Sequence, residues 1–219
     1  MEKVCIVLLP AYNEEKSIGK VIDEITALPY KYGILVVDNN SKNGTAEIIR
    51  KAVIEKGIQT IFVEEQGKGH AVQKALMFID SPMILMDSDF TYPACYIPAL
   101  VEGLERYDVV IGYRKKKDKD SMTLTNKVGN YLLTKLANLL YGTHIHDVCS
   151  GMWAFRDARP LVVESTGFTL EAEFLIQSSR YKWKIGEIPI HYRAREDKPK
   201  LRVIDGFRIG AYLIRERLR

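Results

Sequence analysis

Two aspartates, Asp87 and Asp89, follow an uninterrupted apolar run, Met83-Ile84-Leu85-Met86. A short apolar run that ends abruptly predicts a strand buried on both faces of a parallel sheet. The aspartates would then lie just beyond its carboxyl end, where open α/β folds bind ligands. Mg²⁺ is usually held by one or two carboxylates together with substrate phosphates. The spacing therefore indicates a metal–diphosphate site, whereas an isolated Asp-x-Asp is more often a solvated turn.

The elements that must position these acids alternate along the first half of the chain. Apolar runs typical of buried strands cover residues 4–9, 34–37, 58–63, 83–86 and 109–112. Apolar residues at helical spacing lie between the first four runs, which predicts βαβ units and a mostly parallel sheet. Because such crossovers are right-handed, the polar loops after the strands gather on one side of the sheet.

The second half has a different pattern, and we interpret the whole chain as one α/β domain. The charged run 114–120 predicts a loop. Periodicity predicts helices over 124–141, 169–181 and 203–218, and short strands over 151–155 and 185–192. Pro189 suits an edge strand because it cannot donate a hydrogen bond to a neighbour.

Composition excludes several classes of protein. The chain has 219 residues, 47% of them hydrophobic, and a formal net charge of +4, which allows one soluble domain with a sizeable core. Cys5, Cys95 and Cys149 form no CxxC pair, so we expect neither zinc nor a disulfide framework, and a reducing cytosol fits. We expect no signal peptide, and no apolar stretch approaches the roughly 20 residues that cross a bilayer.

Three further loops carry groups that suit a nucleotide. In the loop 10–14, Tyr12 could stack on a base and Glu14 could accept from ribose, although the loop could simply lead into a helix. The loop 38–45 offers amide and carboxylate groups to a base edge, or is an ordinary turn. The segment 67–69, Gly-Lys-Gly, precedes a helix whose N-terminus favours anions, but it lacks both common phosphate-loop spacings.

These loops belong to a series of motifs that covers nearly the whole chain. The motifs are Pro10-Ala11-Tyr12-Asn13-Glu14-Glu15, Val36-Val37-Asp38-Asn39-Asn40-Ser41 with Gly44-Thr45, Gly67-Lys68-Gly69, Asp87-Ser88-Asp89 with Tyr92-Pro93, Ile111-Gly112-Tyr113-Arg114, Asp147-Val148-Cys149-Ser150-Gly151-Met152, Ile188-Pro189-Ile190-His191-Tyr192-Arg193 and Lys200-Leu201. In type and order they resemble the family 2 glycosyltransferases of GT-A fold. Within that family they are most similar to polyprenyl-phosphate (dolichyl-phosphate) hexosyltransferases.

The resemblance implies roles for individual residues. Asp87 and Asp89 would hold Mg²⁺ or Mn²⁺ against the donor diphosphate, and Asp89, Asp147 and Arg114 would form the catalytic set, with Arg114 at a phosphate and Asp147 near the transferred sugar. The donor-binding set would be Pro10, Tyr12, Glu14, Asp38, Asn39, Lys68, Asp87, Ser88, Arg193 and Lys200, with Arg195 also facing phosphates. The chain departs from the family at Asn39, which commonly is an aspartate that pairs with the base, at Thr91 and at Pro199.

The implied activity is inverting, metal-dependent transfer of a hexose to a dolichyl or polyprenyl phosphate. The resemblance favours glucose or N-acetylglucosamine over mannose, and a UDP-sugar over GDP-mannose. A phosphate monoester is largely dianionic near neutrality, so it needs positive charge more than a general base. The excess of basic residues in 114–119 and 193–219 suits that need. The nucleotide-binding half would cover about 1–113, and the acceptor half about 114–219.

Other functions remain open at this point. Transfer to a saccharide hydroxyl would need a general base, for which Asp147 or Glu173 is available. A nucleotidyltransferase and a non-catalytic nucleotide-binding module are further alternatives. We expect no nucleic acid as a partner. We expect peripheral contact with the cytoplasmic face of a membrane through residues 124–141 and 203–219, strengthened by Arg215, Arg217 and Arg219.

Overall fold

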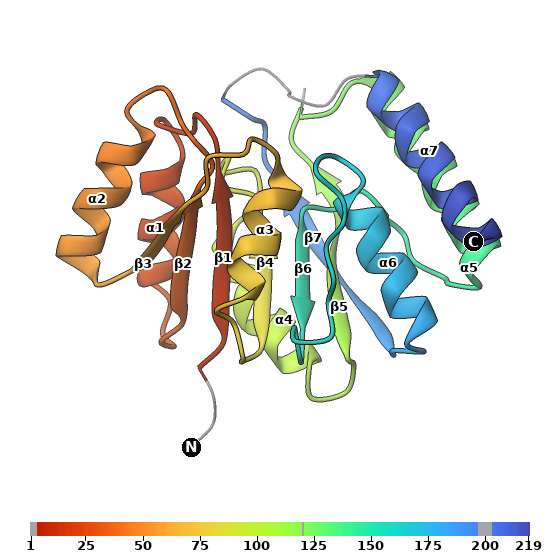
Figure 1. Ribbon diagram of the computed structural model, residues 1–219, viewed down its shortest axis with the longest axis horizontal. Coiled ribbons are helices and arrows are strands. Elements are labelled where there is room, and N and C mark those ends of the chain that lie inside the picture. Colours follow the sequence, from red (N-terminus) through yellow and green to blue (C-terminus); the bar gives the residue numbers. More distant parts are fainter. Residues whose placement is uncertain (1–3, 120, 197–202) are drawn as a thin grey trace.

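The computed structural model describes residues 4–119, 121–196 and 203–219 (Figure 1). In chain order its elements are β1 (Ile6–Ala11), α1 (Ile18–Thr26), β2 (Gly33–Asp38), α2 (Thr45–Lys56), β3 (Gln59–Phe62), α3 (Lys68–Leu76), β4 (Met83–Met86), the 3₁₀ helix η1 (Ala94–Tyr96), α4 (Ile97–Gly103), β5 (Val109–Lys117), α5 (Leu124–Tyr141), β6 (Met152–Phe155), α6 (Leu170–Arg180), β7 (Ile185–Tyr192) and α7 (Val203–Leu218).

The strands form one mostly parallel sheet in the order β3-β2-β1-β4-β6-β5-β7. Only β6 runs against its neighbours among the described strands, because it pairs antiparallel with both β4 and β5. The expected α/β fold with a mostly parallel sheet is therefore confirmed. Pro189 lies on β7 at the edge of the sheet, as the sequence predicted.

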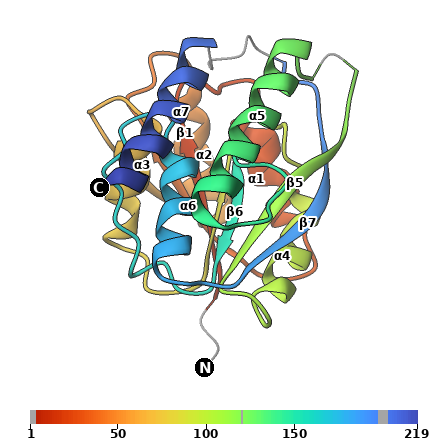
Figure 2. The same cartoon turned by 90° about the vertical axis from the view of Figure 1, so that its right-hand side faces the viewer.

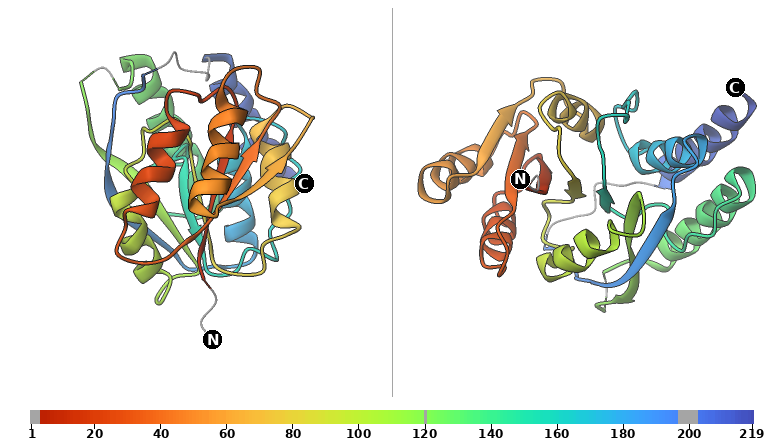
Figure 3. Two further views of the ribbon diagram at one scale, coloured as in Figure 1. Left: turned by 90° about the vertical axis from the view of Figure 1, so that its left-hand side faces the viewer. Right: turned by 90° about the horizontal axis from the view of Figure 1, so that it is seen from below.

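Helices cover both faces of the sheet (Figure 3). Alternate residues of β1 face opposite sides, so Val7 and Leu9 belong to the core that includes residues of α1, α2 and α4, whereas Leu8 belongs to the core that includes residues of α3, α6 and α7. Trp153 on β6 and Phe174 on α6 are fully buried in the second of these layers, with their ring centroids 5.9 Å apart. Two cores of this kind fix the loops at the carboxyl ends of β1, β2 and β4.

The structure corrects the first part, 114–117, of the loop predicted over 114–120. Strand β5 continues through the charged residues as far as Lys117, because β7 pairs with it in parallel up to Tyr192. A register shift between Arg114 and Lys116 interrupts this pairing. Arg114 is therefore held on a strand instead of in a loop, and it is buried. Sequence periodicity also missed the short helices η1 and α4.

Helices α5 and α7 lie side by side, with their N-termini at the same edge of the molecule as the carboxyl ends of the parallel strands (Figures 1 and 2). The Tyr141 hydroxyl donates to the Leu213 carbonyl at 2.7 Å and ties their far ends together. Within the described ranges, none of the helices has both the length and the apolar content that crossing a bilayer requires.

Candidate functional site

A cavity of about 1500 Å³ opens at the carboxyl edge of the sheet and extends between α5 and α7. We call its charged portion the polar end, and it is lined by Pro10, Tyr12, Glu14, Asn39, Lys68, Asp87, Ser88, Asp89, Arg114, Glu171 and Arg195. The other portion is the apolar end, and it is lined by Leu124, Val128, Leu132, Leu133, Leu136, Phe207, Ile209, Gly210, Ala211 and Ile214. A ligand with a charged head and an apolar body matches this arrangement.

Backbone conformation is unusual where β1, β2 and β4 end. Asn13, Asn40 and Phe90 have φ angles of 55°, 62° and 67°, the left-handed region that favours glycine. Such residues cost of order 1–3 kcal/mol each and cluster at functional sites. The Ser88 hydroxyl donates to the Pro10 carbonyl at 2.6 Å, which joins two of these loops. The strain therefore accompanies a fixed arrangement of the polar end.

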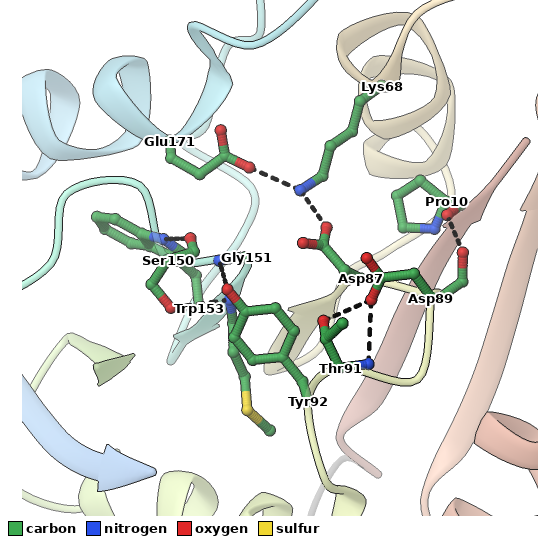
Figure 4. Close-up of polar contacts among 12 residues, drawn as sticks. Pro10, Lys68, Asp87, Asp89, Thr91, Tyr92, Ser150, Gly151, Trp153 and Glu171 are labelled. Carbon is green, nitrogen blue, oxygen red and sulfur yellow. Dashed lines mark hydrogen bonds and ion pairs between the residues drawn. The ribbon is translucent and has the colours of Figure 1, made fainter. Parts of the chain in front are cut away.

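The Asp87 carboxylate lies over Gly151, which precedes β6 (Figure 4). A Cβ on Gly151 would lie 1.9 Å from Asp87 Oδ2, so only glycine leaves room for the carboxylate. On its other side Asp87 accepts from Lys68 Nζ at 2.5 Å, and the same ammonium donates to Glu171 at 2.6 Å. Burial opposes charge on Lys68, but the two carboxylates outweigh it and raise the pKa of the ammonium.

The glycines beside Lys68 allow close packing of α3 on the segment that precedes α6. A Cβ on Gly67 would lie 2.0 Å from the Thr166 carbonyl oxygen, and one on Gly69 would lie 1.6 Å from that of Ser165. Gly67 also has a φ of 138°, which other residues rarely adopt. The Gly-Lys-Gly motif therefore brings Glu171 of α6 to Lys68 across 103 positions of sequence.

Asp89 and Glu14 are joined by one arginine. Arg195 contacts Asp89 at 2.8 Å through one terminal nitrogen and Glu14 at 2.8 Å through the other. Burial and the neighbouring Asp87 raise the pKa of Asp89, against the lowering effect of Arg195 and Thr91. The Nε of Arg195 is buried and has no hydrogen-bond partner within the described part of the chain. It is therefore a buried donor that the described residues leave unsatisfied, on an arginine that lines the polar end.

Arg114 is held by a bidentate ion pair. Its Nε and terminal nitrogen donate to the two oxygens of Asp147 at 2.6 and 2.7 Å, and Asn130 of α5 donates to the same carboxylate at 2.9 Å. Burial raises the pKa of Asp147, but Arg114 more than reverses this and the net pKa is lowered. Asp147 does not line the cavity, so it lies behind Arg114.

Asn39 is fully engaged with the backbone. Its amide nitrogen donates to the carbonyls of Glu65 and Val63 at 2.6 and 3.3 Å, and its oxygen accepts from the Gly67 N–H at 2.7 Å. A carboxylate in this place would put an oxygen against two carbonyl oxygens. The departure from the family's aspartate therefore has a local reason, since asparagine fixes the loop 63–67.

Two residues of the predicted donor set, Asp38 and Arg193, lie outside the cavity lining, and a third is not described. Asp38 is buried and accepts from the Ser41 N–H at 3.1 Å. Arg193 pairs with Glu24 at 2.8 Å and stacks on the Phe90 ring, 4.4 Å from its centroid. Lys200 lies outside the described residues. The other predicted residues of the donor set line the polar end.

Sequence reasoning missed two residues that the fold brings to the site. Glu171 and Asn130 lie in helices without any motif around them, and only the tertiary contacts with Lys68 and Asp147 identify them. Asn130 lines the cavity, and its Oδ1 is a buried acceptor without a partner among the described residues. A ligand hydroxyl could satisfy it.

The carboxylates at the polar end fit a divalent cation that shares its ligands with a diphosphate. Four acids (Glu14, Asp87, Asp89 and Glu171) and three cations (Lys68, Arg114 and Arg195) line it, so the lining has an acidic excess before any phosphate enters. Within the described ranges no group of three or more His, Cys, Asp or Glu residues could hold a metal alone. Mg²⁺ commonly takes one or two carboxylates and completes its ligands from substrate phosphates.

Comparison with known proteins gives a consistent result. A family model described as "Glycosyl transferase family 2" matches residues 6–158. The chain is 37% identical over 212 residues to "Dolichyl-phosphate hexose transferase" of Haloferax volcanii, covering 94% of this chain and 88% of that protein. It is 32% identical over 202 residues to "Glycosyltransferase AglJ" of the same organism, covering 90% of this chain and 65% of that protein.

A solved structure shares the fold at lower identity. Glucosyl-3-phosphoglycerate synthase from Mycobacterium tuberculosis, crystallised with Mn²⁺, UDP-glucose and phosphoglyceric acid, superimposes with a TM-score of 0.73. The identity is 21%, and the match covers 99% of this chain and 79% of that one. The likeness extends the shared architecture to the whole chain, beyond the residues that the family model matches.

Proposed function

The chain belongs to glycosyl transferase family 2, and on that basis we propose that it transfers a hexose from a nucleotide sugar to a polyprenyl phosphate with inversion at the anomeric carbon. The observation that carries the proposal is one continuous cavity with a charged end and an apolar end. The curated relative named as a dolichyl-phosphate hexose transferase supports the choice of acceptor.

The donor diphosphate is assigned to the polar end. Lys68, Arg114 and Arg195 line it and supply positive charge for anionic oxygens. Asp87 and Asp89 would hold Mg²⁺ or Mn²⁺ there. The cation would stabilise the negative charge that grows on the leaving diphosphate. Tyr12 and Glu14 are assigned to the nucleoside, and Asn130 to a sugar hydroxyl.

The acceptor is assigned as a phosphate because the candidate bases are engaged elsewhere. Asp147 is bound through both oxygens by Arg114. Glu173 accepts from the backbone N–H groups of Glu164 and Ser165 at 2.9 and 3.1 Å and lines a different cavity, of about 610 Å³. A phosphate monoester is largely dianionic with a second pKa near 6, so it needs no such base.

The chemical step then requires no proton transfer. A phosphate oxygen of the acceptor forms a bond to the anomeric carbon while the bond from that carbon to the donor diphosphate breaks. The electron pair of the broken bond leaves with the nucleoside diphosphate. Attack from the face opposite the leaving group inverts the configuration. Arg114 is well placed to orient a phosphate because Asp147 and Asn130 fix its guanidinium.

The polyprenyl chain is assigned to the apolar end, and the surrounding surface to contact with a membrane. Leu124 and Phe207 line the apolar end and are 78% and 73% exposed, which leaves apolar surface in water that a lipid would cover. Arg215 and Arg219, at the far end of α7, both pair with Glu216. The membrane contact is therefore proposed at the N-terminal ends of α5 and α7, on the cytoplasmic face.

A transfer assay in which each sugar donor is tested individually with each acceptor tests the proposal. UDP-glucose, UDP-N-acetylglucosamine and GDP-mannose are each incubated with Mn²⁺ and a prenyl phosphate, a chain-free phosphate monoester or a free saccharide. We expect a hexosyl prenyl phosphate of inverted configuration, formed from one of the UDP-sugars, and no product with EDTA. Asp89→Ala should lower kcat/KM by at least about a hundredfold, and keep the wild-type circular dichroism spectrum.

Each failure in this assay has a separate meaning. Transfer to the saccharide alone would overturn the phosphate acceptor. Full activity in EDTA would overturn the metal, and product from GDP-mannose would overturn the choice of base and sugar. Retained configuration would overturn direct displacement.

A further inference from the structure

Lys68 lies between two carboxylates of different elements. Its ammonium is 2.5 Å from Asp87, after β4, and 2.6 Å from Glu171, on the first turn of α6 (Figure 4). The Glu171 side chain is only 12% exposed, and nothing in the sequence motifs singles it out. The pair is held in place because the backbone of Ser165 and Thr166 packs directly on Gly67 and Gly69.

A divalent cation on Asp87 cannot leave this arrangement unchanged. The Lys68 ammonium carries a full positive charge and donates to Oδ1 of Asp87. Two cations on one carboxylate repel each other, so a divalent cation on Asp87 weakens the attraction of that carboxylate for Lys68. Glu171 is the second partner that Lys68 already has, and it keeps the ammonium in the cavity without Asp87.

We propose that Glu171 is a positioning residue that retains Lys68 when a divalent cation takes Asp87. Lys68 is thereby freed from Asp87 but stays beside the polar end, where a diphosphate oxygen can accept from it. The proposal rests on the metal role assigned to Asp87 under the proposed function. It predicts that Glu171 affects binding of the cation through Lys68, and not merely through its own charge.

A double-mutant cycle on the full chain separates these two effects. Mn²⁺ affinity is measured by titration calorimetry, with saturating UDP, for wild type, Glu171→Gln, Lys68→Met and the double variant. We expect Glu171→Gln to weaken Mn²⁺ binding by about tenfold when Lys68 is present, the size of one charge-assisted hydrogen bond. In the Lys68→Met background the same substitution should change the affinity by less than about threefold.

A matched control comes from the same helix. Glu173→Gln removes a buried carboxylate two residues away that does not line the large cavity, and it should leave Mn²⁺ affinity within about twofold of wild type. UDP affinity at saturating Mn²⁺ gives a second readout. It should fall in Lys68→Met, because the displaced ammonium is then missing, and fall less in Glu171→Gln.

The outcomes distinguish this inference from the proposed function. Equal weakening by Glu171→Gln in both backgrounds would show that Glu171 acts through charge alone, and would overturn its role toward Lys68. Unchanged Mn²⁺ affinity in Glu171→Gln would overturn it as well. If wild type bound no Mn²⁺ with or without UDP, the metal role of Asp87 would fail first, and the inference with it.

Discussion

The two ends of the cavity are built in opposite ways. At the polar end each acid that lines it contacts a basic side chain or backbone group from a distant element, as Lys68 joins Asp87 and Glu171. At the apolar end Leu124, Leu132 and Phe207 are 78%, 60% and 73% exposed and project from two neighbouring helices. One end is organised before any ligand arrives, whereas the other exposes apolar surface to water.

This difference suggests how the two substrates are bound. Charged groups that are already fixed in place need little rearrangement when charge develops on a bound substrate. This suits the end of the cavity where the chemistry is proposed. Apolar area left in water costs about 25 cal/mol per Å² relative to burial, so covering the apolar end with a ligand is favourable in free energy. Binding at the polar end should therefore depend on single polar atoms, whereas binding at the apolar end should depend on the size and polarity of its side chains. The substitutions below test that contrast, from the largest expected effect to the smallest.

Asp147→Asn should have the largest effect on stability. It leaves the buried Arg114 guanidinium without its carboxylate, and breaking a buried ion pair costs about 3 kcal/mol or more. Urea denaturation at pH 7 measures the free energy of unfolding. The exposed pair Asp157–Arg159 provides the control, because Asp157→Asn should change stability by no more than about 0.5 kcal/mol. Equal losses in the two variants would contradict a preorganised polar end.

The same pair predicts a pH dependence with a definite sign. The folded pKa of Asp147 lies below that of the unfolded chain, about 3.9, because Arg114 outweighs burial. The ion pair therefore contributes fully above the unfolded pKa and is lost as pH falls through the folded one. The stability difference between wild type and Asp147→Asn should stay constant from pH 7 to 5 and shrink below about pH 4. A difference that grows with acid would refute this assignment.

Much of the fold could be predicted from the sequence because its signals are local. The run 83–86 and the alternating helices before it specify a parallel sheet and its carboxyl edge. Residues 114–117 of the expected loop belong to a strand because β7 pairs with them, and pairing across some 75 residues leaves no local signal in the sequence. The antiparallel placement of β6 between β4 and β5 is likewise determined by tertiary packing and has no local signal in the sequence.

The candidate site divides in the same way. Asp87, Asp89 and Lys68 stand in motifs that follow strands, and the structure brings them together. Glu171 reaches Lys68 only because two glycines allow α3 to pack on the segment before α6. Helical periodicity predicted a helix over 124–141, but it could not show that Leu124 and Leu132 stay exposed while Ala137 is buried. Which face of a helix is covered depends on its neighbours.

Asn39→Asp should have an intermediate effect, localised to the polar end. The new carboxylate would face the carbonyls of Val63 and Glu65 in place of a donor amide, at a cost of about 2 kcal/mol. Chemical denaturation measures this cost. Asn40→Asp is the control, since its half-buried amide makes one such contact, to Glu64, and should cost less than about 1 kcal/mol. A stabilised Asn39→Asp variant that bound UDP more tightly would show that the amide does not organise this loop.

The smallest effect on stability is expected at the apolar end, where Leu132→Asp is matched by Leu139→Asp. Both leucines lie on α5 and are 60% and 82% exposed, but only Leu132 lines the cavity. Each variant should change the free energy of unfolding by less than about 1 kcal/mol, most of it from the lower helix propensity of aspartate.

These two variants should nevertheless differ in their acceptor kinetics. An aspartate at position 132 places a charge where the prenyl chain is assigned, so KM for a long-chain prenyl phosphate should rise about tenfold, and KM for a chain-free phosphate should not. Leu139→Asp should leave both values unchanged. Steady-state kinetics with acceptors of increasing chain length makes the comparison. If both variants weakened long-chain binding equally, the lipid would meet the outer surface of α5 instead of the cavity. If neither did, the exposed apolar end would need a different ligand.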